Sequence, residues 1–99
     1  MLFVFHLLDR TDPNTIRADI RPVHKEYLRQ VADRIAFAGP LLSDDGKAML
    51  GSLLVIDFED RAAAEAWRAA EPFTQAGLYE KVSILAFSNQ WAQKTGFPG

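Results

Sequence analysis

Cysteine is absent from this chain of 99 residues, and so are long apolar runs and an excess of one charge. Without cysteine there can be no disulfide, thiolate nucleophile, iron–sulfur cluster or Cys-type zinc site. The 11 Lys and Arg residues are balanced by 13 Asp and Glu residues, so no basic excess indicates binding to nucleic acid or anionic lipid. Any chemistry must therefore use histidine, carboxylates, hydroxyls or backbone groups.

Hydrophobic residues, by contrast, make up 48% of the chain, which excludes an intrinsically disordered protein. The length predicts one domain over 1–99, with 88–99 as a loosely ordered polar tail. The apolar stretch 1–8 is far shorter than the roughly 20 residues of a membrane span. It also lacks the basic start and cleavage site of a signal peptide. We therefore expect a cytoplasmic protein that does not bind membranes.

Apolar periodicity and turn residues predict elements in the order β-α-β-β-α-β. Short apolar runs bounded by Asp, Gly or Pro predict strands over 2–8, 37–42, 49–58 and 79–87, with a hairpin turn over 43–47. Proline suits a first helical position, so Pro22 should divide the helical segment 14–36 into a turn near 14–19 and a main helix that begins at Pro22. A second helix is expected over 61–70, with Asp60 as its N-cap.

This order predicts an α+β, ferredoxin-like fold, in which a four-stranded antiparallel sheet carries both helices on one face. Residues at helical spacing should face the sheet: His24, Tyr27, Leu28, Val31 and Ile35 from the main helix, and Ala63, Ala66, Trp67 and Ala70 from the second. The first strand is apolar on both sides, which predicts that both faces of the sheet are covered. An apolar face left free by the helices usually marks an interface, so we expect a homodimer packed sheet to sheet.

His24 is the foremost candidate for chemistry. A main helix starting at Pro22 would put His24 in the first turn, where the helix dipole disfavours an imidazolium. A neutral imidazole can accept a proton, and a neighbouring carboxylate would fix its tautomer. The alternative is a core histidine whose ring nitrogens only satisfy backbone groups. Glu71, expected at the unfavourable C-terminal end of the second helix, is either such a carboxylate or merely solvated.

The remaining candidates would bind a substrate. Ser52 either donates a hydrogen bond to a substrate or is a small residue beneath a helix, and the sequence has no nucleophile elbow to activate it. His6 either enters the dimer interior or joins His24 in a metal site, but the spacing of metal-ligand motifs is missing, so no metal is predicted. Aromatic residues would line a cleft or fill the core: Phe37, Phe73 and Tyr79.

An ordered series of short motifs resembles the YCII-related (YciI-like) family as far as Phe87. The series is Met1-Leu2-Phe3-Val4, Arg21-Pro22-Val23-His24, Gly39-Pro40, Gly51-Ser52, Ala66-Trp67, Glu71-Pro72-Phe73 and Gly77-Leu78-Tyr79. The resemblance implies a dimeric α+β barrel of ferredoxin-like protomers, similar to muconolactone isomerase. It also implies a small cleft lined by a His–Asp pair and a Ser. On the matching positions the His is His24, the Ser is Ser52, and Glu71 replaces the Asp with one extra methylene.

The resemblance implies two kinds of activity. One branch of the family is a dehydrochlorinase that acts on a chlorinated hydroxyhydroquinone, and a related group dehalogenates chloromuconolactones. We therefore expect a small lyase or isomerase that needs no cofactor and acts on a cyclic or aromatic small molecule. His24 and Glu71 would be catalytic, and Ser52 with nearby aromatic residues would position the substrate. Two alternatives are a non-catalytic dimeric module that binds a ligand or protein, and a cofactor-free monooxygenase with the same barrel.

Overall fold

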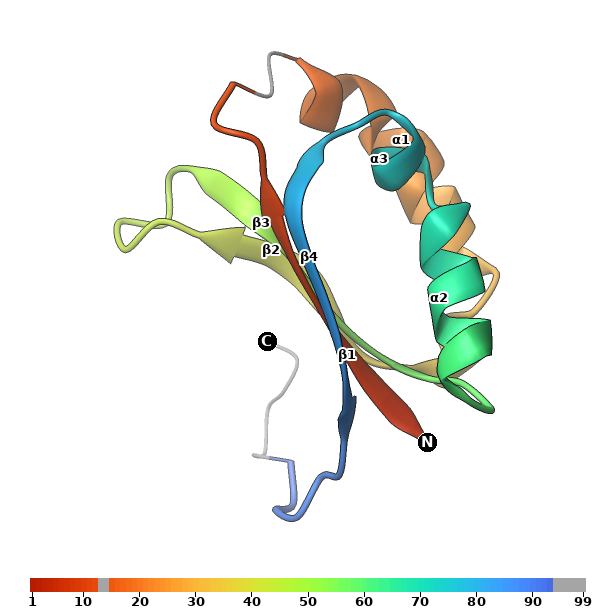
Figure 1. Cartoon of the computed structure of the whole chain (residues 1–99). Coiled ribbons are helices and arrows are strands. Elements are labelled where there is room, and N and C mark those ends of the chain that lie inside the picture. Colours follow the sequence, from red (N-terminus) through yellow and green to blue (C-terminus); the bar gives the residue numbers. More distant parts are fainter. Residues whose placement is uncertain (13–14, 94–99) are drawn as a thin grey trace.

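Four antiparallel strands form one sheet, and the helices of the described chain lie on one of its faces (Figure 1). The computed structural model describes residues 1–12 and 15–93. The elements are β1 (Leu2–Asp9), α1 (Ile16–Arg29), a 3-10 turn η1 (Ala32–Arg34), β2 (Ile35–Leu42), β3 (Met49–Asp57), α2 (Arg61–Ala69), α3 (Pro72–Gln75) and β4 (Tyr79–Phe87). The strand order is β2-β3-β1-β4. This arrangement confirms the predicted ferredoxin-like α+β fold.

The hydrophobic core lies between the sheet and the helices. Side chains alternate along a strand, so Phe3, Phe5 and Leu7 of the central strand β1 all face the helices and are buried. The ring of Phe5 packs edge-on against Phe58 and against Trp67 of α2. This core fixes the distance of α1 and α2 from the sheet and so sets the space available for a site.

Helix α1 is continuous from Ile16 to Arg29 and contains Pro22 in its interior. The prediction that Pro22 divides this segment was therefore wrong. Proline lacks only the one amide that would bond back to Ala18, and packing of the rest of the helix offsets that loss. His24 consequently lies in the middle of the helix, and the expectation of a dipole effect in its first turn was wrong too.

The limits of the first helical segment also differ from the prediction. The helix ends at Arg29, and Ile35 already begins β2, so the extension to residue 36 was wrong. The break follows from the chain needing to reverse direction before β2. The start of the expected turn, residue 14, lies outside the described residues, as do 94–99 of the expected loose tail.

The β2–β3 hairpin follows its local sequence closely. Gly46 adopts a positive φ of 76°, a conformation that glycine reaches without steric cost. The carboxylate of Asp45 accepts hydrogen bonds from the Ser43 hydroxyl and the Lys47 amide. Strand β2 pairs with β3 through two register shifts, one between Ile35 and Phe37 and one between Leu41 and Leu42. The pairing is regular across Gly39-Pro40, so an expected break of the strand at this Gly-Pro sequence was wrong.

Helix α2 begins as predicted, with the Asp60 carboxylate accepting from the Ala63 amide. Its inward face was predicted less well, because Ala64 is the buried residue, whereas Ala66 and Ala70 are exposed. The helix is rotated about its axis so that Ala63, Ala64 and Trp67 face the sheet. The indole ring of Trp67 then fills the space above β1.

Glu71 does not end α2, which was the prediction. The helix stops at Ala69, and Glu71 is the N-cap of the separate short helix α3. Pro72 explains the break, because proline suits a first helical position and starts a new helix there. The carboxylate therefore lies at the favourable end of a helix rather than the unfavourable one.

The sheet face away from the helices carries apolar side chains in cross-strand register. Val4 pairs with Val55 and Leu85, and Phe37 pairs with Val55. Leu85 is 64% exposed and Phe37 is 39% exposed. We call this face the free face; it includes these residues together with Leu2, His6, Leu53 and Phe87. Among the described residues, no helix is long and apolar enough to cross a membrane.

Candidate active site

His24 and Glu71 form a buried hydrogen-bonded pair. The Nδ1 atom of His24 lies 2.9 Å from Oε2 of Glu71, and the two residues are 8% and 0% exposed. Helix α1 supplies the histidine and the N-cap of α3 supplies the carboxylate, so the pair joins two elements that pack against each other. The extra methylene of Glu does not prevent it from reaching His24.

The surroundings of Glu71 determine which ring nitrogen carries the proton. The same oxygen, Oε2, also accepts a hydrogen bond of 2.6 Å from the Phe73 amide. A carboxylate oxygen accepts hydrogen bonds, so we assign Nδ1 of His24 as the donor in this contact. The other nitrogen, Nε2, is then the basic one, and His24 borders a cavity that could hold a substrate. This is the arrangement that a histidine base needs.

A second polar cluster lies beside this pair and joins β1, α1, β3 and β4. Arg17 donates two hydrogen bonds to Asp9, of 2.8 Å from Nε and 2.7 Å from Nη2. The same Nη2 donates to the Ser52 hydroxyl at 3.2 Å. That hydroxyl is in turn 2.9 Å from the Tyr79 hydroxyl. Ser52 is therefore held between a cation and a phenol.

Burial and charge fix the ionisation of this cluster. Burial raises the pKa of Tyr79 far above its usual range, the charge of Glu71 adds to this, and the Ser52 hydrogen bond opposes it in part. Burial lowers the pKa of Arg17, but the hydrogen bond and charge of Asp9 outweigh that effect and raise it overall. Tyr79 is thus a neutral phenol and Arg17 a permanent cation throughout the physiological range.

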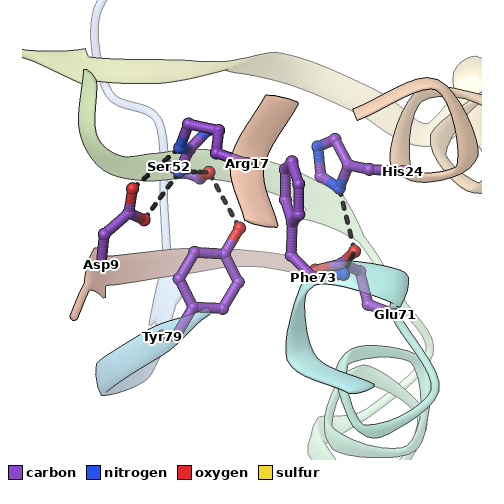
Figure 2. Close-up of polar contacts among 7 residues, drawn as sticks. All are labelled: Asp9, Arg17, His24, Ser52, Glu71, Phe73 and Tyr79. Atoms are coloured by element: carbon purple, nitrogen blue, oxygen red, sulfur yellow. Dashed lines mark hydrogen bonds and ion pairs between the residues drawn. The ribbon is translucent and has the colours of Figure 1, made fainter. Parts of the chain in front are cut away.

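The ring of Phe73 lies between the two clusters and contacts both of them (Figure 2). Its ring stacks on His24, with centroids 4.1 Å apart and planes inclined by 24°. The Arg17 guanidinium carbon lies 4.9 Å from the same ring centroid, within the range of a cation–π contact. The edge of Tyr79 meets it at 6.1 Å. Phe73 therefore holds the imidazole plane in place and keeps water from the His24–Glu71 contact.

An open cavity of about 350 Å³ lies between α1 and the strands β2 and β3. His24, Ser52 and Phe73 line it, together with Arg17. Its volume falls within the range of small-molecule sites. The acid–base pair and the Ser52 cluster therefore meet at one cavity large enough for a single aromatic ring.

The structure brings together most, but not all, of the residues singled out in the sequence. His24, Ser52 and Phe73 line the cavity. Glu71 and Tyr79 lie behind them and reach the site through the contacts described above (Figure 2). Phe37 and His6 do not join them. Both lie on the free face, because their register partners Val55 and Leu53 are neighbours on that side of the sheet.

Sequence reasoning missed Arg17 and Asp9. The signal for Arg17 was its spacing of seven residues from His24, which places both on one side of a continuous helix, two turns apart. The assumed break at Pro22 hid that relation. Asp9 follows the predicted strand 2–8, where an acid is ordinarily a solvated turn residue, and it is the last residue of β1 in the structure. Its role depends on the tertiary contact with Arg17.

Comparison with known proteins identifies the family of this chain. The YCII-related domain family matches residues 1–88. Protein YciI from Escherichia coli O6:H1 (strain CFT073) is 37% identical over 94 residues, covering 88% of this chain and 96% of that protein. An uncharacterised Haemophilus influenzae protein (strain ATCC 51907) is 32% identical over 84 residues, covering 76% and 86%.

A solved structure is similar over nearly the whole chain. It is the 5-chloro-2-hydroxyhydroquinone dehydrochlorinase TftG from Burkholderia phenoliruptrix AC1100, in complex with 2,5-dihydroxybenzoquinone. The TM-score is 0.83 and the sequence identity 29%, over 89% of this chain and 94% of that one. The matched family, the relatives and the shared fold lead to one conclusion: this chain belongs to the YCII-related family.

Proposed function

We propose that this protein is a lyase that needs no cofactor and removes HCl from a chlorinated hydroxyhydroquinone, with His24 as its acid–base residue. The observation that carries the proposal is the 2.9 Å contact between His24 and Glu71 at the edge of an open cavity. The similarity to TftG, a dehydrochlorinase, supports the choice of reaction. Fold alone would not, since one fold serves many reactions.

The reaction balances without an outside oxidant. The proton of one hydroxyl moves to the ring carbon that carries chlorine. The proton of a second hydroxyl is taken up by Nε2 of His24, a carbonyl forms at that oxygen, and the C–Cl bond breaks with its electron pair leaving as chloride. The net loss is one proton and one chloride, and the product is a hydroxyquinone. Glu71 stabilises the imidazolium that forms in between.

The neighbouring residues would orient the substrate. The Ser52 hydroxyl, held between Arg17 and Tyr79, would bond to a ring oxygen. Phe73 offers an aromatic face beside His24, on which a flat ring can stack. These contacts would hold a substrate hydroxyl within reach of Nε2, as general base catalysis requires.

The test is chloride release from 5-chloro-2-hydroxyhydroquinone by the wild-type protein and by His24→Ala. The proposal requires release by the wild type and a loss of about 10²-fold or more in the variant, which is the usual share of a general base. His6→Ala is the matched control, since it removes a histidine from the free face. No release by the wild type, or full release by His24→Ala, would refute the proposal.

The same assay addresses the alternatives. A non-catalytic binding module has no need for a carboxylate that orients a histidine base, and the His24–Glu71 contact favours the enzyme for that reason. A cofactor-free monooxygenase given the same quinol would consume oxygen and would not release chloride. An oxygen electrode run beside the chloride assay distinguishes the two reactions.

We also propose that the protein is a homodimer whose free faces pack together. Support comes from the exposed apolar residues of that face, Leu85 and Phe87 among them at 64% and 42% exposure. Such patches are uncommon on monomers. Light scattering should give twice the chain mass for the wild type, and Leu85→Lys should shift it towards the monomer. A monomeric wild type at micromolar concentration would rule the dimer out.

A further inference from the structure

Four basic residues of α1 line the cavity. Arg17, Arg21, Lys25 and Arg29 recur at intervals of four along the helix and all border the same space. Residues four apart lie on one side of a helix, so the repeat places a row of cations along one wall. No Asp or Glu of the described residues lines this cavity. The chain as a whole carries a net charge of −2, so the row does not follow from composition.

Two of these cations have no charged partner within the described part of the chain. Arg17 is paired with Asp9, and Arg29 with Glu26. Arg21 and Lys25 form no such ion pair with any described residue. They flank His24 in sequence and form a positive rim beside this proposed base. The helix also carries Asp19 and Glu26, and neither of them lines the cavity.

Apart from His24 and Ser52, the rest of the cavity lining is apolar. Ile35, Leu54 and Phe73 contribute to it across from the row of cations. Apolar walls with a few charged groups at one side favour an amphipathic ligand, which has a flat hydrophobic body and one charged end. A purely solvated helix face, the ordinary explanation for a run of charges, would not have these walls opposite it.

We infer that the cavity binds a ring compound that carries an anionic oxygen, with Arg21 and Lys25 holding that oxygen while the ring lies against the apolar walls near His24. The anionic oxygen belongs to either a ring carboxylate or an ionised phenol. The inference rests on the proposed function, because the substrate hydroxyl that gives its proton to His24 carries negative charge until its carbonyl has formed. It goes further in naming the charge of the ligand and two residues that recognise it.

Binding of three probe compounds tests this inference. The first two are 2,5-dihydroxybenzoate and its uncharged amide, 2,5-dihydroxybenzamide, whose affinities are compared by calorimetry at low salt. The third is 4-nitrocatechol, whose absorption spectrum reports whether the bound phenol is ionised. The proteins are the wild type, the double variant Arg21→Gln/Lys25→Gln, and the charge-matched control Arg61→Gln/Lys81→Gln. The control residues lie on α2 and β4, outside the cavity lining.

We expect one of two positive results in the wild type. Either the carboxylate binds about three- to tenfold more tightly than the amide, the scale of one or two partly exposed charge contacts, or bound nitrocatechol ionises at a lower pH than the free compound. In Arg21→Gln/Lys25→Gln the affinities for the carboxylate and the amide should differ by less than about twofold, and bound nitrocatechol should ionise near the pH of the free compound. In the control variant the wild-type preference should persist. Higher salt should weaken it, because the contacts are exposed to solvent.

The inference is overturned if none of the probes shows a preference for the anion in the wild type, including the case in which none binds. It is also overturned if the preference survives Arg21→Gln/Lys25→Gln. Chloride release, measured separately, distinguishes this outcome from failure of the proposed function. Anion preference without chloride release refutes the proposed reaction alone, and chloride release without anion preference refutes this inference alone.

Discussion

The two side-chain functions of Glu71, charge and shape, can be separated by two substitutions. Glu71→Gln keeps the shape and loses the charge. In the wild type, the His24 ring and the Phe73 amide both bond to Oε2. The amide oxygen of the Gln side chain can take the position of Oε2 and accept from both. Glu71→Ala removes the acceptor and leaves both buried donors without a partner.

The expected stabilities follow from these hydrogen bonds. In Glu71→Gln a neutral acceptor replaces a charged one, and the amide NH2 group takes the place of Oε1, which is buried without a hydrogen-bond partner. Together these changes should cost about 2 kcal/mol of unfolding free energy. The alanine variant loses the acceptor of two buried donors, each worth about 1–3 kcal/mol. One of these two hydrogen bonds, from the Phe73 amide, is the N-cap interaction of α3. We expect it to lose about 3–5 kcal/mol in total, a large part of the stability of a domain of this size. Urea unfolding followed by tryptophan fluorescence measures both values.

The expected activities follow a different order. Glu71→Gln should lower chloride release by about 10²-fold or more, roughly 3 kcal/mol of barrier, because the imidazolium loses its counter-charge although the ring stays oriented. The chain has two histidines, so ¹⁵N NMR with His6→Ala for assignment can read the His24 tautomer directly. We expect Nδ1 to carry the proton in the wild type and in Glu71→Gln.

Two results would contradict this reasoning. If Glu71→Gln kept more than half of the wild-type rate, the charge of Glu71 would have no catalytic role. If Glu71→Gln destabilised the protein as much as Glu71→Ala, the hydrogen bonds to Oε2 would not be what the carboxylate contributes to folding. A wild-type His24 protonated at Nε2 would equally contradict the proposed base.

Two further predictions concern the site's surroundings. The pKa of Tyr79 is raised in the folded state by burial, so its contribution to stability is complete below its unfolded pKa of about 10 and is lost above it, by up to about 1.4 kcal/mol per pH unit. Urea unfolding between pH 9 and 11 should show this decline, and Tyr79→Phe should flatten it; an identical slope in the variant would contradict the shift. At Gly51, a methyl group would collide with the backbone carbonyl of Leu7, so Gly51→Ala should cost about 3 kcal/mol or more by overpacking. Gly39→Ala, with open space around it, is the control, and equal melting temperatures for the two variants would refute the argument.

Local sequence determined most of the secondary structure of this protein. The hairpin at Gly46 and the N-cap at Asp60 depend on interactions within a few residues, and both were predictable. The strand Tyr79–Phe87 was predictable from its local residue types, although it forms by pairing with the distant β1. The order of elements then limits the fold to few topologies. The errors fell where packing outweighs local preference, as at Pro22, which a long helix tolerates in its interior.

The resemblance to a family directed attention to His24, Ser52 and Glu71, but it did not say whether a longer acid could reach the histidine. Only the position of α3 decides that. Glu71 caps this helix and is thereby brought back towards α1, across 47 residues of sequence. The extra methylene is accommodated because the cap lies beside the helix that carries His24.

What the sequence alone determined is therefore the set of elements, the α+β class and the histidine–carboxylate candidates. What only the tertiary structure decided is which of these meet. His6 lies across the sheet from the site, whereas Arg17, which the assumed break at Pro22 concealed, contacts Asp9, Ser52 and Phe73 at its centre. The physical reason is that strand and helix patterns arise from neighbours along the chain. A catalytic contact, by contrast, depends on how whole elements pack, which fixes distances to within an ångström only in the folded protein.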